Sequence, residues 1–267
     1  FQQIEFQKLY ALPSRNGIMR PSSVRGNGFK MINMGELFKY SRINNQRMEL
    51  VELNDIEKEN FGIENGDILF ARQSLVREGA GKVCIVIDIE KPATFESHLI
   101  RVRLNKNIAS PLFYYYYYNS ATGYGSVQSI VNQVAAAGIR GSELAKIKIL
   151  LPPLPIQRKI AAILSAYDEL IENNNRRIAI LEKMAEEIYR EWFVRLRFPG
   201  HENTKIVKGV PDGWEVKRIG DVIKNYIGGG WGEENHNISH STGAYVIRGT
   251  DIPALRAGKF DLPPFRY

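Results

Sequence analysis

The feature that most constrains the fold is a long stretch without glycine or proline. From Ile156 to about Arg197 the chain runs for roughly 42 residues without either helix-breaking residue, between "LPPLP" and "FPG". Pro155 suits the first turn of a helix, because proline lacks the N–H that would be unpaired there. The sequence therefore predicts one long helix, which at 1.5 Å per residue would span about 63 Å.

Apolar residues recur along this helix at spacings of three and four, as in a helix that packs against another helix. We call this row the seam, and with the polar Asn174 it consists of Ile160, Ile163, Tyr167, Leu170, Asn174, Ile178, Leu181, Met184 and Ile188. A polar residue in a seam typically fixes the register or the number of paired helices. Alternatively, Asn173, Asn174 and Asn175 mark a loop between two helices.

The chain outside the helix has the composition of a mixed α+β protein. Four runs of strand length, "GDILFAR", "GKVCIVID", "HLIRVRL" and "KIKILL", precede the helix. A polar linker, "HENTKIVKGVPDG", and a second region of strands and turns follow it. We therefore expect a mixed domain over residues 1–154, a spacer helix over 155–198, and a linker with an incomplete second domain over 199–267.

The two outer regions share a weak repeat. "GFKMINMGEL" at 28–37 aligns with "GAYVIRGTDI" at 243–252, so that Glu36 corresponds to Asp251. The same offset aligns Ile4 with Ile219. A constant offset over roughly 35 residues predicts two copies of one domain on either side of the helix.

Charge and cysteine content limit the classes of partner and of site. The 267 residues carry a net charge of +7, which favours an anionic partner, with nucleic acid as the first candidate. The single cysteine, Cys84, excludes an intramolecular disulfide and a cysteine zinc site, and is typical of a cytoplasmic protein. No apolar run approaches the ~20 residues of a membrane helix, and residues 1–20 contain no signal-peptide core.

Catalytic motifs are incomplete. "DLPPF" at 261–265 approaches the (N/D)-P-P-(Y/F) turn of adenine methyltransferases, but Leu262 breaks its spacing, and there is no Gly-x-x-x-x-Gly-Lys-(Ser/Thr) loop for ATP. His236 and His240 would suit a metal only on a helix, which their Gly- and Asn-rich surroundings disfavour. We therefore expect this chain to contain no catalytic residue, no metal site and no bound cofactor.

Three segments rich in Gly, Arg and amide side chains are candidates for reading DNA. Base edges are read by Arg, Asn and Gln, and phosphates are held by Lys, Arg and Ser. The candidates are Arg15, Arg20 and Arg25 in 13–28; Arg72, Gln73, Arg77 and Lys82 in 71–82; and Tyr124, Ser126, Gln128, Asn132, Gln133 and Arg140 in 123–142. Each alone is more simply explained as a solvated surface residue, but together they predict a DNA-reading surface made of loops.

Five consecutive tyrosines occur in "PLFYYYYYNS", residues 111–120. Aromatic side chains can stack on nucleic-acid bases, and they can equally line the buried side of a helix. Pro111 would open such a helix and Gly123 would close it, and no more than about half of the run can face one side. We interpret it as a scaffold helix that packs on the sheet and aims the following loop.

The stretch "LPPLPIQRKIAAILSAYDELIENNNRRIAILEKMAEEIYREWFVRLRFPG", followed by "VPDGWEVKRIGDVI", resembles the central conserved region of the specificity subunit of type I restriction-modification systems. The resemblance is close over residues 145–223. It implies target recognition domains held apart by conserved helices that form an antiparallel coiled coil, each domain reading half of a bipartite site in double-stranded DNA. It also implies modification (methyltransferase) and restriction subunits as partners, which would bind S-adenosylmethionine, ATP and Mg.

The sequence departs from this pattern because the second conserved helix is absent and the second domain is incomplete. We therefore expect a fragment or a shortened subunit that pairs its seam with another copy as a homodimer. The expected fold is α+β, with mixed α/β target recognition domains and a long helix in a coiled coil. The expected function is non-catalytic DNA recognition; the competing interpretation is an oligomeric assembly protein that binds protein rather than DNA.

Overall fold

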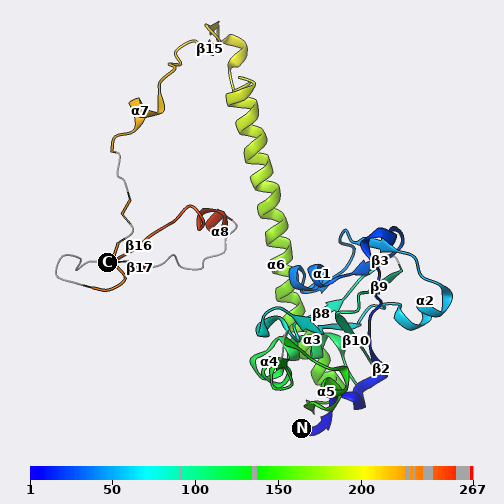
Figure 1. The fold of residues 1–267 in the computed structure, drawn as a ribbon. Coiled ribbons are helices and arrows are strands. Elements are labelled where there is room, and N and C mark those ends of the chain that lie inside the picture. The colour runs from blue at the N-terminus through cyan, green and yellow to red at the C-terminus, as the bar shows by residue number, and fades with distance from the viewer. Residues whose placement is uncertain are drawn as a thin grey trace. The chain divides into compact units, whose positions relative to one another are not determined.

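The computed structural model describes residues 1–90, 92–133, 137–225, 229–230, 232–236, 243–256 and 265–266. It divides into two compact units, Phe1–Glu182 and Lys183–Tyr267, which we describe one at a time. Figure 1 shows the mixed helices and strands of the first unit and the long helix that leads out of it. The expected mixed α+β class is confirmed.

A five-stranded sheet in the order β2-β10-β6-β8-β4 forms the centre of the first unit. β4 runs parallel to β8, and the other neighbours are antiparallel. Its strands are β2 (Tyr10–Asn16), β4 (Arg42–Ile43), β6 (Ile68–Ala71), β8 (Val83–Val86) and β10 (Leu99–Leu104). The four runs predicted as strands are confirmed as β6, β8, β10 and β13 (Lys148–Leu151).

Three smaller sheets surround the central one. They are ordered β5-β3-β9, β1-β13 and β11-β12-β7. Their further strands are β1 (Gln2–Glu5), β3 (Arg25–Ile32), β5 (Glu49–Val51), β7 (Gln73–Ser74), β9 (Ala93–Phe95), β11 (Asn132–Gln133) and β12 (Ala137–Gly138).

The central strands β6 and β8 are buried on both faces. Ile68 and Phe70 of β6 belong to one hydrophobic cluster, and Leu69 and Ala71 belong to another. Successive side chains of a strand point to opposite faces, so a strand covered on both faces is a continuous apolar run. Cys84 of β8 is fully buried, and burial raises the pKa of its thiol. It is therefore a core residue rather than a reactive one.

The tyrosine-rich segment forms helix α3 (Pro111–Asn119), which confirms that it is a helix packed inside the domain. Its role in aiming the segment that follows it stays a prediction. Its buried tyrosines, Tyr114, Tyr115 and Tyr118, lie in the same hydrophobic cluster as Phe6. The ring of Tyr118 has its centroid 4.9 Å from that of Phe6 and 5.2 Å from that of Phe70. Most of this aromatic surface is therefore inside the domain and is not available to stack on bases.

Gly123 does not close α3, and that prediction was wrong. α3 ends at Asn119, and a second helix, α4 (Ala121–Gln128), begins directly after Ser120. Gly123 lies inside α4, where a Cβ atom would collide with the main chain of Tyr117. The glycine is needed because α4 approaches the end of α3 so closely.

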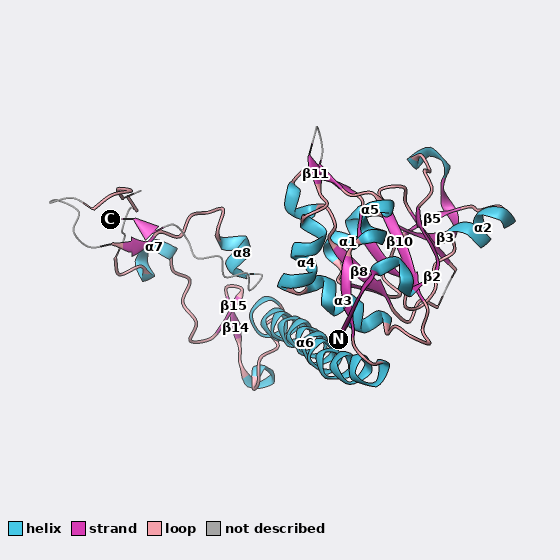
Figure 2. Ribbon diagram, turned by 90° about the horizontal axis from the view of Figure 1, so that it is seen from below, coloured by secondary structure: helices cyan, strands magenta, loops and turns pink. Residues whose placement is uncertain are grey.

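The remaining helices of the first unit are short. They are α1 (Met34–Lys39), α2 (Asp55–Phe61) and α5 (Gly141–Lys146). α1 and α2 begin with asparagines whose main-chain N–H groups donate to a glutamate three residues later, a capping arrangement that satisfies donors at a helix start. Figures 1 and 2 show α2 and α4 on opposite sides of the domain.

The long helix α6 runs from Leu154 to Tyr189, with Pro155 in its first turn. It continues through Asn173, Asn174 and Asn175, so the alternative of a loop at these residues is wrong. Its limits differ from the prediction, because it ends in a π-helical turn, Arg190–Val194, before Arg197. The 36 residues of α6 correspond to a length of about 54 Å.

One side of α6, which carries Gln157 and Asp168, contacts the residues before it in the chain. Gln157 is fully buried, and its side chain bonds to the main chain at Ser110 (2.8 Å), Ile108 (3.1 Å) and Pro152 (2.8 Å). Further along the helix, the hydroxyl of Tyr116 donates to Oδ2 of Asp168 at 2.6 Å. These hydrogen bonds hold α6 against α3 and against the loop that precedes α3.

The second unit begins in α6 and continues through short elements. The ring centroid of Trp214 lies 5.6 Å from that of Phe198 and 5.9 Å from that of Phe193 at the end of the π-helical turn. The other elements are β14 (Ile206–Val207), β15 (Val210–Pro211), α7 (Ile219–Val222), β16 (Ala244–Tyr245), α8 (Ile252–Arg256) and β17 (Phe265–Arg266).

A local hydrogen bond recurs at the offset of the sequence repeat. The N–H of Asn33 donates to Oε2 of Glu36 at 2.9 Å, and the N–H of Arg248 donates to Oδ2 of Asp251 at 2.9 Å. In each case the bond follows a strand, β3 or β16. The aligned positions therefore share local structure, while the proposed division into three domains stays a prediction.

Candidate nucleic-acid interface

Two of the three candidate segments lie side by side. β12 pairs with β7, with Ala137 opposite Ser74 and Gly138 opposite Gln73, and the N–H of Ile139 donates to the carbonyl of Arg72 at 2.9 Å. Residues 72–82 and the described part of 124–140 thus form one surface, which we call the reading surface. The two segments are far apart in the sequence: Arg77 and Gln128, which are in contact, are separated by 51 positions.

Side chains tie the two segments together. Nη2 of Arg77 donates to the carbonyl of Gln128 at 3.4 Å, and Nε2 of Gln128 donates to the carbonyl of Ala80 at 2.9 Å. The hydroxyl of Tyr124 donates to the carbonyl of Glu78 at 3.4 Å. Because these contacts join the loop after β7 to α4, the loop has a fixed place on the surface.

Five candidates are exposed on the reading surface. They are Gln73, Arg77, Tyr124, Asn132 and Arg140, of which Arg140 directly precedes α5. Nδ2 of Asn132 also donates to the carboxylate of Glu143 at 3.3 Å, which orients its amide. The main chain of Gln133 lies in β11, but its side chain is outside what the structure describes.

Other candidates in these segments have internal partners. Nη1 of Arg72 donates to the carbonyl of Ser97 at 3.1 Å. Nζ of Lys82 donates to the carbonyl of Phe38 at 3.1 Å and lies 5.1 Å from the centroid of its ring. The hydroxyl of Ser126 donates to the carbonyl of Gly123 at 2.6 Å within α4. We therefore assign these three side chains to the support of the surface.

The third candidate segment, residues 13–28, is not one loop as expected. Arg15 is in β2 with its guanidinium 5.5 Å from the ring centroid of Phe61, and Arg25 begins β3. Arg20 pairs with Glu57, and its hydrogen bond, followed by that of the Asn54 N–H, holds the pKa of that carboxyl below its usual value. Arg20 and Arg25 are thus half-buried and paired with carboxylates, whereas Arg15 is exposed and contacts the ring of Phe61 in α2.

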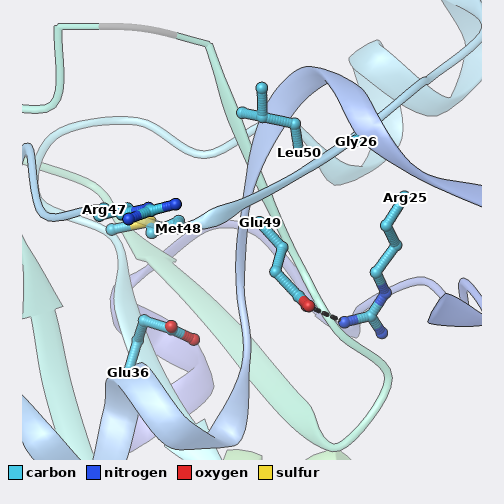
Figure 3. A pocket seen from close by; sticks show the side chains of 7 residues that line it. All are labelled: Arg25, Gly26, Glu36, Arg47, Met48, Glu49 and Leu50. Carbon is cyan, nitrogen blue, oxygen red and sulfur yellow. Dashed lines mark hydrogen bonds and ion pairs between the residues drawn. The ribbon is translucent and has the colours of Figure 1, made fainter.

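Arg25 lines the pocket of Figure 3, where it points toward Glu49 and forms an ion pair with it. The other lining residues are Gly26, Glu36, Arg47, Met48 and Leu50. Two cations and two carboxylates balance one another here. The pocket therefore lacks the excess positive charge that would attract a phosphate backbone.

The seam of α6 lies on the side of the helix away from the domain. At 3.6 residues per turn it is roughly 150° around the helix from the buried stripe of Gln157, Ala161 and Ser165. Its apolar side chains are between 39% exposed at Ile160 and 64% exposed at Tyr167, and Asn174 is exposed as well. The pairing of the seam with another helix stays a prediction.

Within the described residues, no group of three or more His, Cys, Asp and Glu side chains could hold a metal ion. His240 and residues 261–264 of the "DLPPF" segment lie outside the described part, so the structure does not place those motifs. None of the helices in the described part is both long enough and apolar enough to cross a membrane.

Comparison with known proteins gives a consistent family. The family model of the type I restriction modification DNA specificity domain matches residues 21–183. Among curated relatives, the type I restriction enzyme MjaIX specificity subunit of Methanocaldococcus jannaschii is 36% identical over 160 residues, which are 58% of this chain and 37% of that protein. The putative MjaX specificity subunit of the same organism is 29% identical over 216 residues, 78% of this chain and 49% of that protein.

The fold agrees with that of a solved structure. The type I restriction-modification system S subunit from M. genitalium has a TM-score of 0.52 and 18% identity, covering 72% of this chain and 46% of that one. The chain spans about half the length, or less, of these relatives. Since the family model covers more than half of the 267 residues, the chain belongs to the family of type I restriction-modification DNA specificity domains.

Proposed function

We propose that this chain is a DNA-recognition subunit, or part of one, of a type I restriction-modification complex and reads one half of a bipartite DNA site. The observation that carries the proposal is the pairing of β7 with β12, which joins two predicted reading segments on one surface in a chain of this family. The chain itself performs no catalysis; methylation and cleavage belong to partner subunits, which bind S-adenosylmethionine, ATP and Mg.

The exposed side chains of the reading surface have the chemistry that base reading needs. Gln73 and Asn132 carry amides that can bond to both N6 and N7 of adenine, and Arg77 and Arg140 can bond to guanine or to phosphate. The strands and α4 hold these groups in place, so that little order has to be gained on binding. Each good two-point contact to a base contributes about 1–3 kcal/mol of discrimination.

Helix α6 is proposed to set the distance between two reading surfaces. Its length of about 54 Å limits the separation of half-site centres to about 16 base pairs. The second surface comes from another copy paired through the seam or from a longer chain, and the helices dock the methyltransferase subunits. Such a complex would act on chromosomal DNA in the cytoplasm.

Methylome sequencing of a host with and without this gene tests the function directly, because loss of one bipartite methylated motif would identify both the activity and the target. In vitro, Arg77→Ala and Arg140→Ala should weaken binding to the cognate duplex and flatten its salt dependence by about one unit for each phosphate that is no longer neutralised. Arg20→Ala is the matched control, since Arg20 pairs with Glu57 away from the reading surface. An unchanged methylome, or a larger effect of Arg20→Ala, would contradict the proposal.

Pairing through the seam is tested by light scattering at tens of micromolar protein. The wild-type chain should be a dimer, and Ile163→Glu with Leu170→Glu should be a monomer, because each places a carboxylate in the apolar row. Arg176→Glu, on an exposed position outside the seam, should remain dimeric. A monomeric wild type would exclude the homodimer, and a dimer without any base preference would favour the assembly protein instead.

A further inference from the structure

Leu75 has an unusual position on the reading surface. Its relative exposure is 96%, the highest among the large apolar side chains of the described residues, and the next residue, Val76, is 59% exposed. Both follow β7 and precede the 3-10 turn Arg77–Gly79. An isolated exposed leucine is ordinary, but an adjacent apolar pair at the tip of a loop in a binding surface needs a reason.

The loop that carries Leu75 is held in place on both sides. Before it, Ser74 pairs with Ala137 of β12, and the Ser74 hydroxyl accepts the N–H of Val76 at 3.2 Å. After it, the N–H of Gly79 donates to the carbonyl of Val76 at 3.1 Å, and Arg77 is bonded to Gln128. The main chain therefore presents Leu75 outward and gives it little opportunity to fold back onto the domain.

The surroundings of Leu75 indicate what it contacts. Gln73 and Arg77, two residues away on either side, are exposed polar groups, and Asn132 is exposed on β11, which pairs with β12 in the same sheet as β7. The two carboxylates of this surface, Glu78 and Glu143, are outnumbered by its four cations, Arg72, Arg77, Lys82 and Arg140. A site for a protein partner would present a wider apolar area, whereas here two apolar side chains are set between cationic and amide groups. A duplex with phosphates outside and stacked bases inside fits this arrangement.

We propose that Leu75 is a wedge that enters the base stack at one step of the half-site, with Arg77 near the adjoining phosphate. The inference rests on the proposed DNA reading and deepens it. A wedge makes recognition depend on how easily a step unstacks, and pyrimidine–purine steps unstack most easily. The reading surface would then select one step of the half-site by how easily the DNA deforms there, and other positions by contacts to the edges of the bases.

The experiment selects binders from a random-sequence duplex pool with the full chain, co-expressed with the methyltransferase gene of its own system. Leu75→Ala should keep the thermal stability of the wild type, because the side chain packs against almost nothing in the folded domain. It should bind the selected duplex about tenfold more weakly and lose the preference for a pyrimidine–purine step at one position only. Leu75→Met keeps an apolar side chain of similar reach and should retain both.

Two controls separate the wedge from other effects. Ile56→Ala removes a side chain that is 72% exposed on α2 and should leave binding unchanged. A mismatch at the selected step removes most of the unstacking cost and should bring Leu75→Ala to within about twofold of the wild type. Recovery by the mismatch is specific to a wedge, since it would not replace a side chain missing from the groove.

The outcomes that overturn the wedge are distinct from failure of the proposed function. If the wild type and Leu75→Ala select the same motif with the same affinity, the wedge is wrong and DNA reading stands. If replacing thymine by uracil weakens the wild type to the level of Leu75→Ala, Leu75 reads a thymine methyl group in the groove and is not a wedge. If the wild type selects no motif, the proposed function itself fails, and the wedge fails with it.

Discussion

Two tyrosines of α3, Tyr116 and Tyr118, should respond in opposite ways to the same substitution. Tyr118 is 1% exposed, and its hydroxyl has no hydrogen-bond partner within the described structure. Tyr116 is half-buried, and its hydroxyl donates to Asp168 of α6 at 2.6 Å. Replacing either by phenylalanine removes only the hydroxyl and keeps the ring in its place.

The expected magnitudes follow from these surroundings. An unpaired buried hydroxyl costs about 1–3 kcal/mol, so Tyr118→Phe should raise the free energy of unfolding by about 1 kcal/mol. A hydrogen bond to a carboxylate contributes about 1.5–3 kcal/mol when buried, and partial exposure reduces this, so Tyr116→Phe should lower the free energy of unfolding by about 1 kcal/mol. Each kilocalorie per mole should shift the melting temperature by about 2–4 °C.

Urea unfolding followed by circular dichroism measures both changes, with equal m-values as the condition for comparing them. Tyr118→Ala is the reference for a large loss of stability, because removing the ring that packs on Phe6 and Phe70 should lower the free energy of unfolding by about 3–5 kcal/mol. The reasoning is refuted if Tyr118→Phe destabilises the protein by about 1 kcal/mol or more, since its hydroxyl would then have a partner in solution. It is also refuted if Tyr116→Phe has no effect, because the contact between α3 and α6 would then contribute nothing.

Three further predictions concern the helices around this core. Gly123→Ala should destabilise the protein by more than about 2 kcal/mol, because its Cβ would collide with the main chain of Tyr117. Gly125→Ala, with open space around the same helix, should instead stabilise it by about 0.5–1 kcal/mol. Equal effects of the two substitutions in urea unfolding would exclude this packing. Gln157→Leu removes the partner of three main-chain groups, one buried and two partly buried, and should cost about 2 kcal/mol. Hydrogen exchange at the Ser110 N–H should become faster, and unchanged exchange there would disprove the bond. Burial raises the pKa of Tyr114 and Tyr118 above the usual value of 10, so their contribution to stability is fully present below pH 10 and is lost as the pH rises above it. Phenolate absorbance of these residues should therefore appear together with the loss of circular dichroism in an alkaline titration, and separate transitions would contradict their burial.

The long helix could be predicted because its signals are local. The absence of glycine and proline and the row of apolar residues both lie within the segment itself, and α6 follows them through Asn174. Its end was misplaced, since the π-helical turn Arg190–Val194 contains no residue that breaks a helix. Gly123 was misjudged for the opposite reason, because a glycine required by close packing looks in the sequence like a glycine that ends a helix.

The candidate interface could be predicted only in part. The segment 71–82 was identified from its glycines, its basic residues and Gln73, but nothing local shows that it pairs with residues near Ala137. The internal partners of Arg20 and Arg25 were missed because Glu57 and Glu49 lie 37 and 24 positions away. Leu75 was not singled out, since exposure depends on the packing around a residue and not on its type.

The buried side chain of Gln157 has a consequence for how such a protein can diversify. All three of its partners are main-chain groups, which every amino acid provides. The joint between α6 and residues 108–152 therefore does not depend on which side chains the reading surface carries. On the proposed function, substitutions at positions such as Gln73, Arg77 or Asn132 would alter the DNA sequence that is read without loosening this joint. If the proposed function holds, descendants of one scaffold would acquire new targets by exchanging surface residues, while α6 and the spacing that we propose it sets would be inherited unchanged.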